Sequence, residues 1–87
     1  EQERQIFIEE NQLISQLFGK FDENVKIIEK ELGIRILLRD GNIIIKGDIL
    51  SAELGERLIY KLVEIIKSQK KLTKQELRYV SLHQVKV

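Results

Sequence analysis

The sequence predicts an α+β fold, a three-stranded antiparallel sheet with helices on one face plus a C-terminal helix. Segments with a two-residue apolar period alternate with segments of helical period, in the order β-α-α-β-β-α followed by one more helix. Asp40-Gly41 separates two isoleucine-rich segments and predicts a two-residue hairpin. At 87 residues, the chain can form one modest core.

The first segments predict a strand and a short helix. Glu1–Gln5 is polar and is expected to fray, whereas Ile6–Ile8 favours a strand. Asn11 is a suitable N-cap for the helix that follows. One apolar face then recurs at helical spacing, formed by Leu13, Ile14, Leu17 and Phe18.

Two glycines delimit the second helix. Gly19 is expected to end the first helix, since glycine adopts positive φ without a Cβ clash, and Gly33 to end the second. The Asp22 carboxylate is expected to cap the second helix. Its apolar stripe is Val25, Ile28 and Leu32, with Ile27 as a flank of the core.

The hairpin strands are predicted over Ile34–Asp40 and Asn42–Lys46. Asp48 then caps the longest helix, which is expected to run to about Lys67. Gly55 inside it costs about 1 kcal/mol relative to alanine, so we expect this helix to pack closely against a neighbour. Its core stripe is predicted to contain Leu54, Leu58, Leu62, Ile65 and Ile66.

A final helix is predicted from Lys74 to about Leu82. Thr73 and Glu76 form a capping box, and Leu72 with Leu77 forms a hydrophobic staple. His83–Val87 resembles the start of a connection. The predicted organisation is therefore a frayed N-terminus (1–5), one domain (6–67), and a basic break with an extra helix (68–87) leading to a further domain outside this chain.

Composition excludes several classes of function. Fifteen basic residues face fourteen acidic ones, so the net charge of +1 gives no strong global attraction for nucleic acid. The chain has no cysteine, no apolar run of membrane-spanning length and no signal-peptide pattern. His83 has no nucleophile arranged around it, and Lys46-Gly47 reverses the Gly-Lys order of a phosphate loop. We therefore expect no catalytic site, metal site or cofactor in this chain.

The spacing around the first helix pair resembles the K-homology (KH) signature. The matching positions are Gly19, Val25, Ile28, Gly33 and Ile36, and the predicted element order is that of a type I KH fold. Asp22 stands where that family has the second glycine of its loop. The chain is more similar still to the N-terminal domain of the PhoH-like ATPases, the phosphate starvation-inducible proteins. This similarity is carried by Leu17–Gly33, Gly47-Asp48 and Leu72-Thr73.

The PhoH-like resemblance implies a KH-like RNA-binding module of a bacterial, cytoplasmic P-loop ATPase that acts in RNA metabolism and the phosphate starvation response. The nucleotide-binding domain, with its ATP and Mg, would lie downstream of this chain, and the full-length protein could be a homo-oligomer. The missing initiating methionine agrees with a piece of a longer protein.

The resemblance also implies a site for single-stranded RNA, contacted by Gly19, Lys20, Phe21, Arg35 and Arg39. The loop has an equally weighted alternative, a plain helix connection in which Asp22 caps and Phe21 fills the core. Asp22 favours that alternative, since its carboxylate would repel phosphate.

A second function class stays open, a protein-interaction or oligomerisation domain that has kept the fold and lost the groove. Asp22, the low net charge and the apolar residues Ile27 and Leu37 favour it. An independent enzyme is the least favoured reading, because no site chemistry is present.

Overall fold

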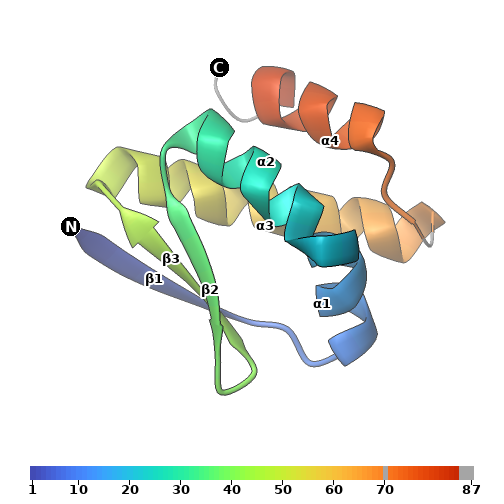
Figure 1. Cartoon of the computed structure of the whole chain (residues 1–87), viewed down its shortest axis with the longest axis horizontal. Coiled ribbons are helices and arrows are strands. Elements are labelled where there is room, and N and C mark those ends of the chain that lie inside the picture. The colour runs from blue at the N-terminus through green and yellow to red at the C-terminus, as the bar shows by residue number, and fades with distance from the viewer. Residues whose placement is uncertain (70, 85–87) are drawn as a thin grey trace.

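A computed structural model describes residues 1–69 and 71–84 (Figure 1). The elements in chain order are β1 (Gln2–Phe7), α1 (Asn11–Phe18), η1 (Lys20–Asp22), α2 (Glu23–Leu32), β2 (Arg35–Arg39), β3 (Asn42–Gly47), α3 (Ile49–Gln69), α4 (Lys74–Tyr79) and η2 (Val80–Gln84).

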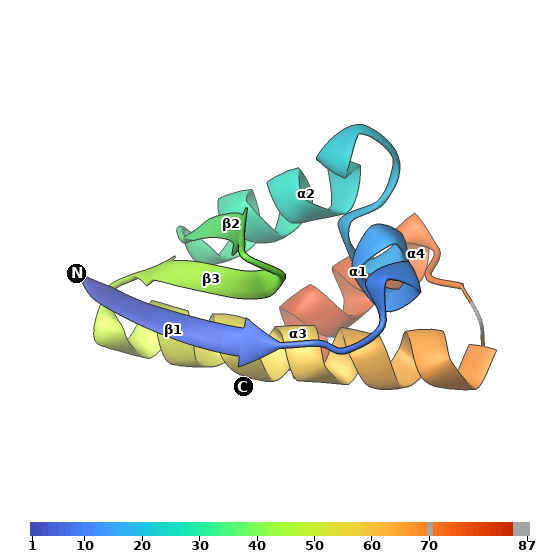
Figure 2. The same ribbon diagram turned by 90° about the horizontal axis from the view of Figure 1, so that it is seen from below.

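The three strands form one antiparallel sheet in the order β1-β3-β2, so the last strand lies between the first two (Figure 2). Arg39 pairs with Asn42 across the predicted two-residue turn. Asp40 (φ 52°) and Gly41 (φ 81°) both have positive φ, as the hairpin prediction requires.

Helices cover one face of this sheet. α3 contacts β1 and β3, whereas α2 contacts β2 and α1 packs on both helices. The core between the layers contains Ile6, Ile36, Ile43 and Ile45 from the sheet. The predicted stripe of α2 is buried there, with Ile27 as its partly buried flank. The predicted α+β fold class, with its C-terminal helix, is thus confirmed.

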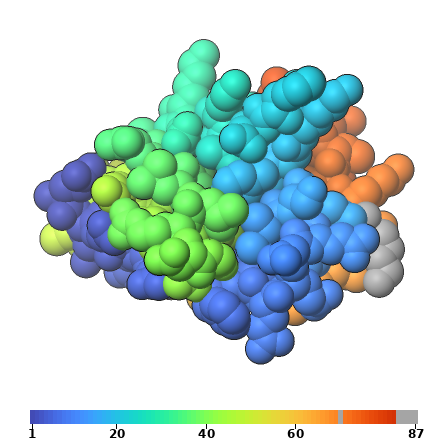
Figure 3. Space-filling model, turned by 60° about the horizontal axis from the view of Figure 1, so that its bottom comes forward, coloured from blue at the N-terminus to red at the C-terminus, as the bar shows by residue number. Residues whose placement is uncertain are grey.

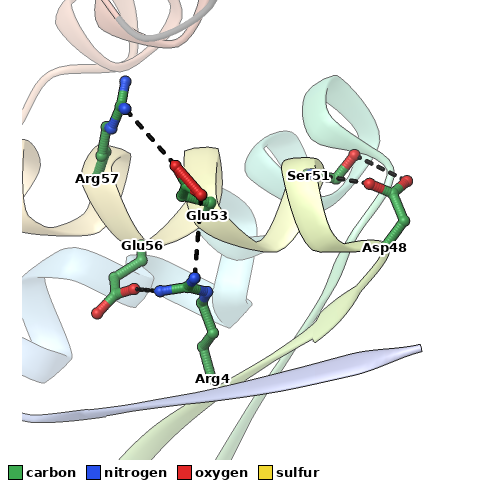
Figure 4. A network of polar contacts seen from close by, with 6 residues as sticks. All are labelled: Arg4, Asp48, Ser51, Glu53, Glu56 and Arg57. Carbon is green, nitrogen blue, oxygen red and sulfur yellow. Dashed lines mark hydrogen bonds and ion pairs between the residues drawn. The ribbon is translucent and has the colours of Figure 1, made fainter.

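The N-terminus differs from its prediction. β1 begins at Gln2 rather than Ile6, so the frayed segment expected over residues 1–5 is wrong for the residues that pair with β3. The reason is a tertiary contact. Arg4 forms an ion pair with Glu56 and lies 4.0 Å from Glu53, both on α3 (Figure 4). Cross-strand pairing and this ion-pair cluster together hold a polar segment in the sheet.

The predicted cap of α1 is also wrong. Asn11 is the first residue of the helix, and the N-cap position belongs to Glu10, whose extended backbone (φ −97°, ψ 114°) makes no side-chain cap bond. The predicted apolar face is otherwise correct, since Leu13, Ile14 and Leu17 are buried. Packing against the core therefore stabilises this short helix without a side-chain cap.

The long helix α3 begins as predicted. The Ser51 amide donates to Asp48 Oδ1 at 2.9 Å (Figure 4). Its buried seam is shifted from the predicted stripe, with Ala52 and Gly55 buried and Leu54 only partly buried. A Cβ on Gly55 would lie 2.7 Å from Ile34 Cδ1, so the glycine permits the close packing that its position predicted. No helix in the described part of the chain is apolar over the length that crossing a lipid bilayer requires.

The last helix starts at the predicted capping box, in which the Glu76 amide donates to Thr73 Oγ1 and the Thr73 amide to Glu76 Oε1. α4 ends at Tyr79, and the wider π-helical turn η2 follows where a regular helix to Leu82 was predicted. There the Ser81 hydroxyl donates to the Leu77 carbonyl at 2.8 Å, a contact that bends helices. Residues 85–87 of the expected connection lie outside the described residues.

Candidate nucleic-acid interface

The α1–α2 loop is held tightly against the first helix. Gly19 has a φ of 78°, and a Cβ there would lie 2.8 Å from the Asn24 side-chain nitrogen. Asn24 is buried, and its amide nitrogen donates to the Gln16 carbonyl at 3.4 Å. Gly19 therefore serves two purposes, since it permits the positive φ and lets Asn24 tie the start of α2 to α1.

Phe21 points into solvent. Its side chain is 80% exposed, and its backbone has a positive φ of 56°. Lys20 Nζ lies 5.6 Å from the centre of its ring, within the range of a cation–π contact. The alternative in which Phe21 fills the core is therefore wrong. The loop presents an aromatic ring and a cation side by side.

Asp22 occupies the N-cap position of α2 without acting as the predicted cap. Its backbone is left-handed (φ 58°, ψ 28°), whereas side-chain caps require an extended backbone, and its carboxylate makes no cap hydrogen bond. The first amides of α2 consequently lack a side-chain acceptor. Asp22 still has positive φ at the position where the KH signature has its second glycine.

The final helix meets α2 beside this loop. Lys74 Nζ lies 3.0 Å from Glu23 Oε2, which joins the first residues of α4 and α2. None of the described residues covers the loop, since Lys20, Phe21 and Asp22 are all exposed. Its surface is therefore accessible to a partner.

The two predicted arginines lie on another surface. Arg35 and Arg39 alternate along β2 with Ile36, which is buried under the helices, so they lie on the opposite, open face of the sheet. Gly19, Lys20 and Phe21 belong to the helical layer. In Figure 3, the β2–β3 hairpin (green) and the α1–α2 region (light blue to cyan) are both at the surface. The five predicted residues thus form two groups, not one groove.

Glu29 is a feature that sequence reasoning missed. The Ile36 amide, on the unpaired edge of β2, donates to Glu29 Oε2 of α2 at 2.9 Å. A carboxylate therefore occupies the seam between α2 and the sheet edge. The sequence contains one indication of this role, because Glu29 follows Val25 by four residues and so lies beside the buried stripe of α2.

The carboxylates of the described residues could serve two roles, metal binding and helix capping. Within the described ranges, no three His, Cys, Asp or Glu side chains converge on a possible metal position. The carboxyl groups with a lowered pKa are Asp48 and Glu76, each because it accepts hydrogen bonds from the backbone and hydroxyl of a helix-cap partner, Ser51 or Thr73. These shifts are explained by helix capping.

Comparison with known proteins shows a similarity to a bacterial protein. The chain is 30% identical over 63 residues to a PhoH-like protein of Bacillus subtilis (strain 168). The match covers 72% of this chain and 20% of that relative, so the chain corresponds to about a fifth of the relative's length. No protein-family model matches the sequence, and no solved structure matches. The similarity supports a PhoH-like relationship for this domain.

Proposed function

We propose that this chain is a KH-like module that binds single-stranded RNA through the α1–α2 loop. The observation that carries the proposal is the exposed Phe21 ring with Lys20 beside it. The left-handed backbone of Phe21 costs folding free energy, and its exposed ring contributes no burial to offset that cost. A binding role accounts for both features.

The chemistry of the loop suits a nucleotide strand. A base can stack on the Phe21 ring, a contact worth about 1–3 kcal/mol, and Lys20 can pair with a flanking phosphate. Gly19 supports the loop indirectly, because its missing Cβ leaves room for the Asn24 side chain that ties α2 to α1, and no side chain caps the start of α2. Asp22 weakens the site, because its exposed carboxylate repels phosphate.

The similarity to a PhoH-like protein extends the proposal to the whole protein. We place the module at the N-terminal side of a cytoplasmic P-loop ATPase that acts on RNA in the phosphate starvation response. ATP and Mg would bind to that downstream domain, and the RNA held by this module would be positioned for it. The module would contribute binding without chemistry.

The test is a fluorescence-anisotropy titration of a labelled, unstructured RNA of about 16 nucleotides, at about 50 mM and about 200 mM salt. The wild-type chain should bind, and more weakly at the higher salt. Phe21→Ala should weaken binding by about 1–3 kcal/mol, because a stacked base is lost. Lys20→Ala should weaken binding and, unlike Phe21→Ala, should also reduce its salt dependence.

Matched controls lie on α3. Tyr60→Ala removes a half-exposed aromatic ring, and Lys61→Ala removes an exposed lysine. Both should bind RNA like the wild type. Equal losses in the loop and control variants would indicate non-specific attraction, and no binding at low salt would refute the proposal.

A second candidate is a protein-interaction or oligomerisation domain. The carboxylate of Glu29 on the β2 edge favours it, because a phosphate strand entering the seam beside α2 would meet this charge. The predicted apolar contacts contribute little, since Ile27 packs on the core and Leu37 is half-buried. A mass that rises with protein concentration in sedimentation velocity, without RNA binding, would establish this function.

A further inference from the structure

The open face of the sheet has a regular arrangement of side chains. The strand register places three residues in each of three rows that run from β1 across β3 to β2. The first row is charged, the second is mainly apolar, and the third has an aromatic, an amide and a guanidinium. In order, the rows are Glu3–Lys46–Arg35, Gln5–Ile44–Leu37 and Phe7–Asn42–Arg39.

The centre of this face is closed by an ion pair. Arg39 Nη1 donates to Glu3 Oε2 at 3.2 Å, although the two residues lie at opposite corners of the arrangement. Their side chains therefore extend across the middle row. Ile44, at the centre of that row, is only 2% exposed although it lies outside the core cluster beneath the helices. The ion pair explains why this residue is covered on an open face.

The charges on the open face are unequal. The nine residues of the three rows include three cations, Arg35, Arg39 and Lys46, and one carboxylate, Glu3. Lys46 Nζ lies 3.9 Å from Glu3 Oε1, so this carboxylate is close to two of the three cations. Among the described residues, Arg35 has no ion-pair partner. The face therefore has an excess of positive charge that the net charge of the whole chain does not reveal.

We propose that the open face of the sheet is a second contact surface for single-stranded nucleic acid, and that Glu3 competes with the strand's phosphates. Arg35, Arg39 and Lys46 contact the phosphates. Phe7, which is 67% exposed at the end of the third row, provides a ring on which a base can stack. The inference rests on the proposed RNA-binding function, but on different residues from those of the loop.

Glu3 limits the affinity of this surface. In the free protein its carboxylate holds Arg39 and Lys46, so a phosphate must displace it before either cation can bind. Because all these groups are at least partly exposed, the exchange requires no change in the core. No carboxylate of the described residues has to be displaced from Arg35, so this residue makes the first contact with a phosphate.

The experiment measures the salt dependence of RNA binding by the whole chain. Each phosphate contact contributes about 0.7 to the slope of log K against log salt for single strands. Arg35→Ala and Arg39→Ala should each reduce the slope by about that amount. Glu3→Gln should bind more tightly and increase the slope by about 0.7 to 1.4, because it frees one or two cations for phosphate.

Two α3 variants are the matched controls. Glu64→Gln changes the net charge as Glu3→Gln does, at an exposed position of α3. Arg57→Ala matches the arginine variants. Neither control should change the slope, because both residues lie on α3, outside both the open face of the sheet and the α1–α2 loop. Thermal melting of each variant checks that the fold is kept.

The outcomes separate this inference from the proposed function. If Phe21→Ala weakens binding while the open-face variants match their α3 controls, the loop binds RNA and the second surface is refuted. If Glu3→Gln raises the mass of the protein in solution without changing the slope, the face is a protein interface and the inference is wrong. If the wild type binds no RNA, the proposed function and the inference both fail.

Discussion

At Gly55, the absence of a side chain lets the helix α3 pack close to the sheet. A Cβ there would meet Ile34 Cδ1 at 2.7 Å and Ile45 Cγ2 at 3.4 Å. Both isoleucines are buried, so neither can move aside into solvent. The close approach of α3 to the sheet depends on this glycine, despite the cost in helix propensity.

We expect Gly55→Ala to destabilise the protein by about 1–3 kcal/mol, because overpacking outweighs the gain in helix propensity. Ile34→Val removes the methyl group that the new Cβ would meet. It should cost about 0.5–1.5 kcal/mol alone and less in the Gly55→Ala background. Urea denaturation of the four proteins in this double-mutant cycle measures the coupling, and additive changes would contradict the proposed contact.

Asp22 combines an unfavourable backbone with an unfavourable charge for RNA. We expect Asp22→Gly to be more stable than Asp22→Asn by about 0.5–1 kcal/mol, since glycine adopts φ 58° without a Cβ clash. Comparing these two variants cancels the effect of the charge on the α2 dipole. Both should bind RNA more tightly than the wild type, because both lack the carboxylate. Unchanged RNA affinity in both variants would show that the Asp22 carboxylate does not lie near the bound RNA.

At the scale of elements, helix caps link stability to pH. Asp48 caps α3 and Glu76 caps α4, and hydrogen bonds from Ser51 and Thr73 hold the pKa of each carboxyl below its ordinary value, 3.8 for Asp48 and 4.5 for Glu76. The unfolded chain therefore takes up these protons at a higher pH than the folded chain. The stabilisation is complete above the ordinary pKa values and is lost as the pH falls through the folded ones.

The expected result is a melting temperature that falls as the pH drops below about 4.5. In the Asp48→Ala, Glu76→Ala double variant, the melting temperature should be lower at neutral pH and fall less on acidification. Circular dichroism melts between neutral and acid pH provide the measurement, with Glu64→Ala, an exposed carboxylate on α3, as the control. Parallel curves for the double variant and the control would contradict the capping explanation.

At the scale of the whole molecule, α4 belongs to the same core as the sheet. Leu77 is fully buried and Val80 is 5% exposed, and both are members of the core cluster. The Lys74–Glu23 ion pair adds a contact at the surface between α4 and α2. The predicted boundary at residue 68 therefore does not divide two independent cores within the described residues.

Leu77→Ala should cost about 2–5 kcal/mol of folding free energy, similar to Leu58→Ala in the centre of α3. Leu82→Ala, at a position that is 46% exposed in η2, should change stability by less than about 0.5 kcal/mol. Urea denaturation followed by circular dichroism compares the three variants. A small effect of Leu77→Ala would mean that α4 is a dispensable appendage.

The sequence by itself determined the features that depend on neighbouring residues. The hairpin at Asp40-Gly41, the Asp48 cap and the Thr73–Glu76 capping box are all local hydrogen-bond or φ preferences, and all are present. The α2 stripe and the element order follow from periodicity in the same way. The sequence also indicated that the loop between α1 and α2 contains Gly19, Lys20 and Phe21, because these residues directly precede α2 in the chain.

Only the tertiary structure decided which residues share a surface. The start of β1 depends on Arg4 reaching carboxylates on α3, and the edge contact of Glu29 depends on how α2 lies beside β2. Strand register places Glu3 diagonally opposite Arg39 and moves both predicted arginines away from the loop. Such contacts join segments far apart in the chain, so their geometry arises from the packing of the layers and not from local residue preferences.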